Sequence, residues 1–261
     1  MRINLKKSWL VGTGCILAFC LLFSCGKNQV ERDKEIFQAE KYRDLGELYF
    51  KEGKYTAALK EFVKAEKLNP DDHILHNDLG LTYMYKRKPD IAIVHFKKAL
   101  ALKDDYSPAR NNLGNAYAEK AQWDKAIEQY EIVTQDLLYA TPEYPLSNLG
   151  LAYYEKKDYA RSEKYYLESL KIQKDFFMAL YGLARTYMAM NRPGEAILKL
   201  KTAADLAPEQ PRVHFELGRA YAMNRDYKKG YEAYQEVVKL DPGTPLADEA
   251  QLEAQKIRHL F

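Results

Sequence analysis

The residues best suited to chemistry are five histidines and three cysteines, and the spacing of the histidines argues against a catalytic centre. The histidines are His73, His76, His95, His214 and His259. His73 and His76, three residues apart on an expected helix, could hold a metal ion only weakly. The chain has no Gly-rich phosphate loop, HExxH or nucleophile motif. We therefore expect no enzyme activity, no metal site, no cofactor and no small-molecule substrate.

Cys25 is the one cysteine whose surroundings imply a chemistry. Three basic residues precede an apolar run over residues 9–23, which is short for a membrane span and typical of a signal peptide. The run ends in Leu22-Phe23-Ser24-Cys25, which resembles the bacterial lipobox. That resemblance implies removal of residues 1–24 and a mature Cys25 with diacylglycerol on its thiol and a further acyl chain (palmitate) on its amine. An uncleaved anchor, or an ordinary signal peptide with a chance cysteine, is the alternative.

The segment after the lipobox bears on location and partners. Gly26 resembles the residue found there in outer-membrane lipoproteins, and residues 25–38 are expected to form a polar tether. Residues 1–24 carry three basic residues and no acidic ones, so the chain's 40 basic residues fall to 37 against 37 acidic. A balanced charge argues against a nucleic-acid partner.

A 34-residue pattern that starts at Ala39 occurs six times. Its first copy places Gly46 and Ala58 at positions 8 and 20, and Tyr49 and Phe62 at positions 11 and 24. Small residues let two antiparallel helices approach closely, and the aromatic residues fill the space around the contact. The pattern resembles the tetratricopeptide repeat (TPR). This implies an all-α superhelical solenoid of six helix-turn-helix repeats, over residues 39–72, 73–106, 107–142, 143–176, 177–210 and 211–244, with a C-terminal capping helix over 245–261.

The copies differ from the pattern in some residues and, at one place, in spacing. Ala184 stands at position 8 of the fifth repeat, where glycine is usual. Between the third and fourth repeats, residues 136–145 add two residues and contain two prolines. This interruption is either a tolerated loop insertion or a local change of twist that separates two halves of three repeats.

In TPR proteins, positions 2, 5, 9 and 12 of each first helix point into a concave groove. We expect the partner-binding residues to be Asn77, Leu81, Met84, Asn111, Asn115, Tyr144, Leu151, Tyr154, Met178, Tyr181, Arg185, Met188, Phe215 and Arg219. The three asparagines resemble the ladders that hold a peptide backbone in TPR grooves. The aromatic and methionine residues are expected to be exposed anchors, because exposed apolar clusters mark interaction sites. The alternative is that neighbouring helices bury these side chains.

The combination of a lipobox, six repeats and the join DLLYATPEYPLSNLG resembles the type IV pilus pilotins, the PilF, PilW and Tgl group. The resemblance implies a non-enzymatic lipoprotein on the periplasmic face of the outer membrane. Its implied partner is the pilus secretin, which it would help to localise or assemble. A general cell-envelope TPR adaptor, which scaffolds peptidoglycan enzymes or outer-membrane protein assembly, is the alternative. A cell-wall enzyme would need a cluster of titratable residues that the sequence does not offer.

Overall fold

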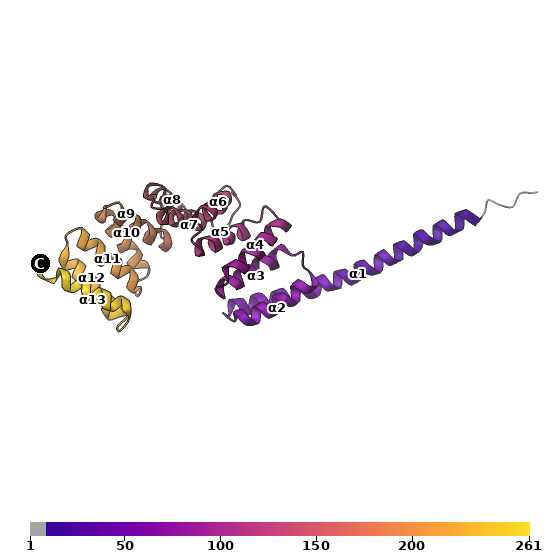
Figure 1. Ribbon diagram of the computed structural model, residues 1–261, viewed down its shortest axis with the longest axis horizontal. Coiled ribbons are helices and arrows are strands. Elements are labelled where there is room, and N and C mark those ends of the chain that lie inside the picture. The colour runs from indigo at the N-terminus through magenta and orange to yellow at the C-terminus, as the bar shows by residue number, and fades with distance from the viewer. Residues whose placement is uncertain (1–8) are drawn as a thin grey trace, which may run out of the picture. The chain divides into compact units, whose positions relative to one another are not determined.

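The computed structural model describes residues 9–261, with side chains described from residue 29. In that part of the chain there are thirteen α-helices, one 3-10 helix and no strand (Figure 1). The elements are α1 (Trp9–Lys51), α2 (Tyr55–Leu68), α3 (His73–Tyr85), α4 (Pro89–Leu102), α5 (Ser107–Glu119), α6 (Trp123–Val133), α7 (Glu143–Glu155), α8 (Tyr159–Ile172), α9 (Phe177–Ala189), α10 (Pro193–Leu206), α11 (Pro211–Met223), α12 (Tyr227–Leu240), α13 (Pro245–Ile257) and η1 (Arg258–Leu260).

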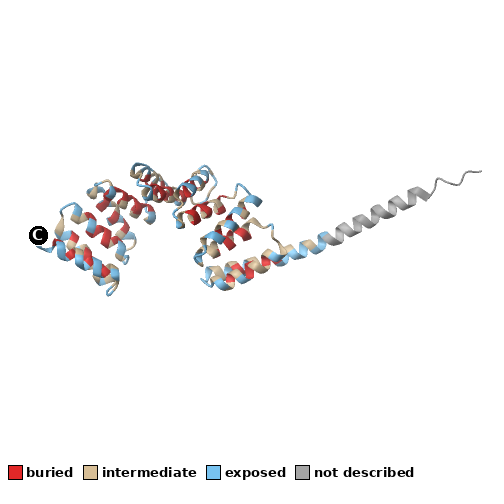
Figure 2. Cartoon of the chain, viewed as in Figure 1, coloured by how far each residue is buried: buried red, intermediate tan, exposed pale blue. Residues whose placement is uncertain are grey.

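The predicted fold class is confirmed: the chain is an all-α TPR solenoid in which helices pair and a last helix, α13, packs on α12. Buried residues line the facing sides of paired helices (Figure 2). No helix in the described part is both long and apolar enough to cross a membrane. The expected signal peptide over residues 1–24 and the lipidated Cys25 lie outside the residues whose side chains are described.

The helix boundaries follow from local chemistry. Asp72 caps α3, because its carboxylate accepts hydrogen bonds from the backbone N–H groups of Ile74 (2.9 Å) and Leu75 (3.2 Å). Five helices carry proline in the first turn, where the missing N–H has no helical partner. Position 15 of every repeat has a positive φ, which turns the chain from the first helix into the second. Only the first repeat uses glycine there; the others use Arg87, Ala121, Lys157, Asn191 and Arg225.

The helices of a repeat touch where position 8 meets position 24. A Cβ added to Gly114 would lie 2.5 Å from Cε1 of Tyr130, and four other repeats show the same fit of glycine against an aromatic ring. In the fifth repeat both members of this pair differ. Position 8 is Ala184, and position 24 is Leu200 instead of an aromatic residue; both belong to the same core cluster. Both residues are fully buried. The departure from glycine at position 8 is therefore matched by a smaller partner at position 24.

The chain divides into two compact units; the first ends at Asp105 and the second begins at Tyr106. The first unit contains α1–α4 around Phe62, Leu75 and Leu79. The second contains α5–α13, whose core has one cluster around α8–α11 and another where α13 covers α11 and α12.

The 136–145 interruption lies inside the second unit, where α7 packs against both α5 and α6. The boundary between units thus falls between the second and third repeats, and the interruption does not separate two halves of three. Leu137 and Leu138 within it are 95% and 93% exposed.

Residues 29–38, the described part of the expected tether, are helical and continue α1. Gln29 donates a hydrogen bond to Asp33 (2.9 Å), and Arg32 lies 3.8 Å from Glu35. Side chains three or four residues apart support a helix in this way. The segment therefore rises by ~1.5 Å per residue as a helix, against ~3.3–3.6 Å if extended.

Candidate functional site

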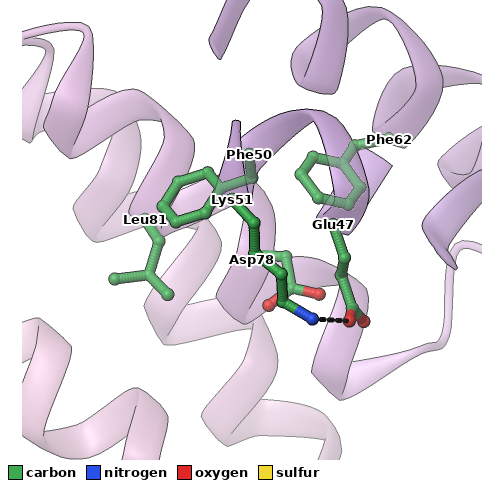
Figure 3. A pocket seen from close by; sticks show the side chains of 6 residues that line it. All are labelled: Glu47, Phe50, Lys51, Phe62, Asp78 and Leu81. Atoms are coloured by element: carbon green, nitrogen blue, oxygen red, sulfur yellow. Dashed lines mark ion pairs between the residues drawn. The ribbon is translucent and has the colours of Figure 1, made fainter. Parts of the chain in front are cut away.

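In the first unit, a pocket of about 240 Å³ opens between α1, α2 and α3 (Figure 3). It is lined by Glu47, Phe50, Lys51, Phe62, Asp78 and Leu81. Lys51 forms an ion pair with Glu47 (4.0 Å), so part of the acidic lining is already neutralised. Of the three groove residues predicted on α3, Leu81 lines this pocket. Met84 is half-buried and Asn77 is buried, and neither lines the pocket.

Asp78 is the residue of this pocket whose hydrogen bonding is incomplete. Its Oδ2 atom is buried and has no hydrogen-bond partner, while Asn77 donates to Oδ1 (3.4 Å). Burial, and secondarily the carboxylate of Glu47, raises the pKa of Asp78 to about 7. A buried acceptor without a partner carries a desolvation penalty that an incoming donor would remove. The pocket thus offers a site for a basic or hydrogen-bond-donating side chain next to the apolar Phe50 and Leu81.

The second unit carries an aromatic and cationic surface on α7 and α9. The Arg185 guanidinium lies 4.5 Å from the ring centroid of Tyr154. Tyr181 is half-buried, packs on the core and stacks parallel to Phe177, and burial raises the pKa of its hydroxyl. Leu151 also packs on this core. The arrangement fixes the aromatic faces in place before any partner binds.

Exposed side chains extend this surface. Tyr144 on α7 and Met178 on α9 are both exposed, and the Tyr144 ring meets Phe176 edge to face at 4.8 Å. Arg219 on α11 is exposed and pairs with Glu216 at 2.9 Å. Tyr144, Met178, Tyr154 and Arg185 therefore remain candidates for contact with a partner.

Two predicted anchors are wrong. Met188 and Phe215 are only 8% and 6% exposed. Met188 belongs to the core of α8–α11. Phe215 packs against Tyr234, with ring centroids 5.6 Å apart, in the cluster that α13 completes. The capping helix α13 packs on the face of the last repeat where Phe215 was expected to be exposed, so Phe215 is a core residue.

The predicted asparagines make contacts within the protein. Asn115 accepts hydrogen bonds from the Tyr130 hydroxyl (2.8 Å) and from Asn148 Nδ2 (3.0 Å). Asn111 is buried, and its Oδ1 has no partner. Asn77 lies in the other unit, so the ladder of three is not one continuous feature of either unit.

Asp78 and Asn148 were not predicted as site residues, and both occupy position 6 of their repeats. Position 6 is acidic or amide in five repeats, at Asp44, Asp78, Asn112, Asn148 and Glu216. Such a run beside the predicted groove positions is a signal that could have identified them.

Comparisons with known proteins agree with this architecture. Sequence models of the tetratricopeptide repeat match residues 77–145 and 181–245, which is just over half of the chain, and others match residues 46–86 and 144–176. The chain is 26% identical over 107 residues to anaphase-promoting complex subunit 3 of Schizosaccharomyces pombe. That match spans 41% of this chain and only 16% of the relative.

Solved structures resemble this chain along most of its length. The pilF protein of Pseudomonas aeruginosa has a TM-score of 0.73 at 22% identity, over 85% of this chain and 99% of that one. PilW, described as a widely conserved type IV pilus biogenesis factor, has a TM-score of 0.77 at 20% identity, over 82% and 98%. The Cut9–Hcn1 complex has a TM-score of 0.74 at 18% identity, over 89% and 45%. At these identities the likeness establishes the fold.

Proposed function

This chain belongs to the tetratricopeptide repeat family, and we propose that it is a non-enzymatic scaffold that binds a protein partner through the α1–α3 pocket and the α7–α9 surface. The observation that carries this proposal is Asp78, whose buried Oδ2 lacks a partner inside a partly apolar pocket. A partner segment with a Lys or Arg side chain would supply both the missing donor and the balancing charge. Apolar residues beside that cation would fill the space near Phe50 and Leu81.

We further propose that the protein is a type IV pilus pilotin. Support comes from two features together. The fold likeness covers 99% and 98% of the pilF and PilW chains, and the sequence has a stretch ending in Cys25 that resembles a lipobox. In this proposal, acylated Cys25 anchors the protein to the periplasmic face of the outer membrane, and the bound partner is the pilus secretin.

Deletion of the gene tests the pilotin role. Immunoblots of unheated outer membranes should show fewer secretin multimers, while pilin synthesis stays unchanged. A chain with Cys25→Ser should lose its lipid label and its outer-membrane fractionation. Unchanged multimers after a clean deletion would contradict the pilotin role, and normal fractionation of Cys25→Ser would contradict the lipid anchor.

A general cell-envelope adaptor is the second candidate. Its support is that the fold likeness also extends to the Cut9–Hcn1 complex and the sequence likeness to anaphase-promoting complex subunit 3, so this fold is not confined to pilus proteins. A pull-down with the wild-type chain and an Asp78→Ala variant separates the candidates. Recovery of secretin that depends on Asp78 supports the pilotin, whereas Asp78-dependent recovery of other envelope proteins without secretin supports the adaptor.

A further inference from the structure

Three potential metal ligands converge in the first unit, away from the α1–α3 pocket. Glu66, His76 and His95 come from α2, α3 and α4, and their ligand atoms all lie within 4.8 Å of one another. The two Nδ1 atoms of His76 and His95 are 3.1 Å apart, and Glu66 Oε1 is 3.9 Å from His76 Nδ1. His73, the nearest histidine to His76 along the chain, is not one of the three ligands, because the site joins residues of different helices.

The hydrogen bond made by His76 Nε2 fixes the tautomer that places a lone pair on Nδ1. His76 Nε2 is 2.9 Å from the carbonyl oxygen of Pro70. A carbonyl oxygen can only accept, so Nε2 carries the proton and the neutral ring presents a lone pair at Nδ1. Ligating histidines commonly donate their other N–H to a backbone carbonyl in this way, which fixes the ring and its tautomer. His76 is fully buried, so its ring cannot turn away into solvent.

His95 is held in a complementary orientation. Its ring stacks on Tyr83 with centroids 5.4 Å apart, and on His76 at the same separation. Without a metal, His95 Nδ1–H donates to His76 Nδ1 (3.1 Å); with a metal, His95 carries its proton on Nε2 instead.

We propose that Glu66, His76 and His95 form a binding site for a divalent transition metal of the Zn²⁺ class. Two nitrogens at ~2.0–2.1 Å from a tetrahedral ion are about 3.3 Å apart, close to the 3.1 Å found here. The carboxylate of Glu66 supplies the third ligand and a compensating negative charge, and water completes the coordination. Since the three ligands come from three helices, the ion would cross-link the first and second repeats.

The chain contains its own control for this arrangement. His214 occupies the same repeat position as His76 and makes the same contact with a carbonyl, 2.8 Å from Pro208 O. At the positions that correspond to Glu66 and His95, however, the later repeats have Ala204 and Ala233. A histidine in this position with its carbonyl bond thus occurs without the other two ligands, and the proposed site depends on all three.

The test uses the full-length chain with Cys15, Cys20 and Cys25 changed to Ser in every sample, which removes thiol ligands. Titration calorimetry with ZnCl₂ should show one site, and Co²⁺ should give the visible absorption of a tetrahedral complex. His95→Ala and Glu66→Gln should each weaken binding at least tenfold, whereas His214→Ala should leave it unchanged. Zn²⁺ should raise the melting temperature of the parent chain but not of His95→Ala.

Circular dichroism without metal checks that each variant is folded. Because Glu66 is half-buried and its glutamine variant keeps the side-chain shape, Glu66→Gln provides a result even where His95→Ala does not fold. The absence of saturable Zn²⁺ binding, or binding that Glu66→Gln or a folded His95→Ala leaves unchanged, would overturn the proposal. Equal loss in His214→Ala would overturn it too.

Discussion

Ionisation of Asp78 should make the folded first unit less stable as the pH rises. The pKa of this carboxyl is about 7 in the folded chain, against an ordinary value of 3.8. Between these values the folded state binds more protons than the unfolded state, so the free energy of unfolding falls with increasing pH. The loss begins near pH 4 and is complete above about pH 7. This is the reverse of the usual behaviour of a salt-bridged carboxylate.

The size of the effect follows from the same two values. At ~1.36 kcal/mol per pKa unit, full ionisation costs up to about 4 kcal/mol. Asp78 is not completely buried, and solvent relaxes part of this penalty, so we expect about 2–4 kcal/mol. The Asp78→Asn variant cannot ionise. It should match the wild-type chain near pH 4 and exceed its stability by that amount at pH 8.

Urea unfolding at pH 4, 5, 6, 7 and 8 measures this difference, and a carboxyl ¹³C NMR titration measures the pKa itself. Asp71→Asn, at an exposed aspartate in the same unit, is the matched control and should show no such trend. A stability difference between Asp78→Asn and wild type that stays constant from pH 4 to 8 would refute the reasoning. A titration midpoint near 4 would do the same, because it would mean that Asp78 is well solvated.

Three further outcomes follow from packing and backbone geometry. Gly114→Ala should cost ~1–3 kcal/mol, because its Cβ meets the Tyr130 ring at 2.5 Å; an unchanged melting temperature would contradict this fit. Phe215→Ala should cost ~3–5 kcal/mol as a core truncation, whereas Met178→Ala should change stability by less than ~0.5 kcal/mol and weaken partner binding; equal melting shifts would show that Met178 is also core. Ala121→Gly should stabilise the chain by ~0.5–1 kcal/mol in urea unfolding, because φ is +53° there and left-handed backbone costs non-glycine residues ~1–2 kcal/mol, partly offset by the entropy of glycine; a loss of stability would contradict it.

The fold was predictable from sequence because position 8 meets position 24 inside each repeat, a contact that local spacing determines. The candidate site was only partly predictable. Met188 and Phe215 were expected to be exposed, but their burial depends on neighbouring repeats and on α13, which a single-repeat template does not contain. Asp78 was not predicted, because the groove positions of a TPR are 2, 5, 9 and 12 and Asp78 is at position 6. The helical conformation of residues 29–38 could not be predicted from their polar composition, which is compatible both with a loop and with a helix held by side-chain pairs.

The pairing of Ala184 with Leu200 has a consequence for how such a repeat can change by mutation. Five of the six repeats combine glycine at position 8 with an aromatic ring at position 24, whereas the fifth repeat in the chain combines alanine with leucine. A route between the two combinations passes through one of two intermediates. Alanine against an aromatic ring forces a steric overlap, whereas glycine against leucine leaves a void, and each is less stable than either end. The two positions should therefore show strong epistasis in a double-mutant cycle, so a repeat can exchange one combination for the other only while the rest of the array is stable enough to carry the intermediate.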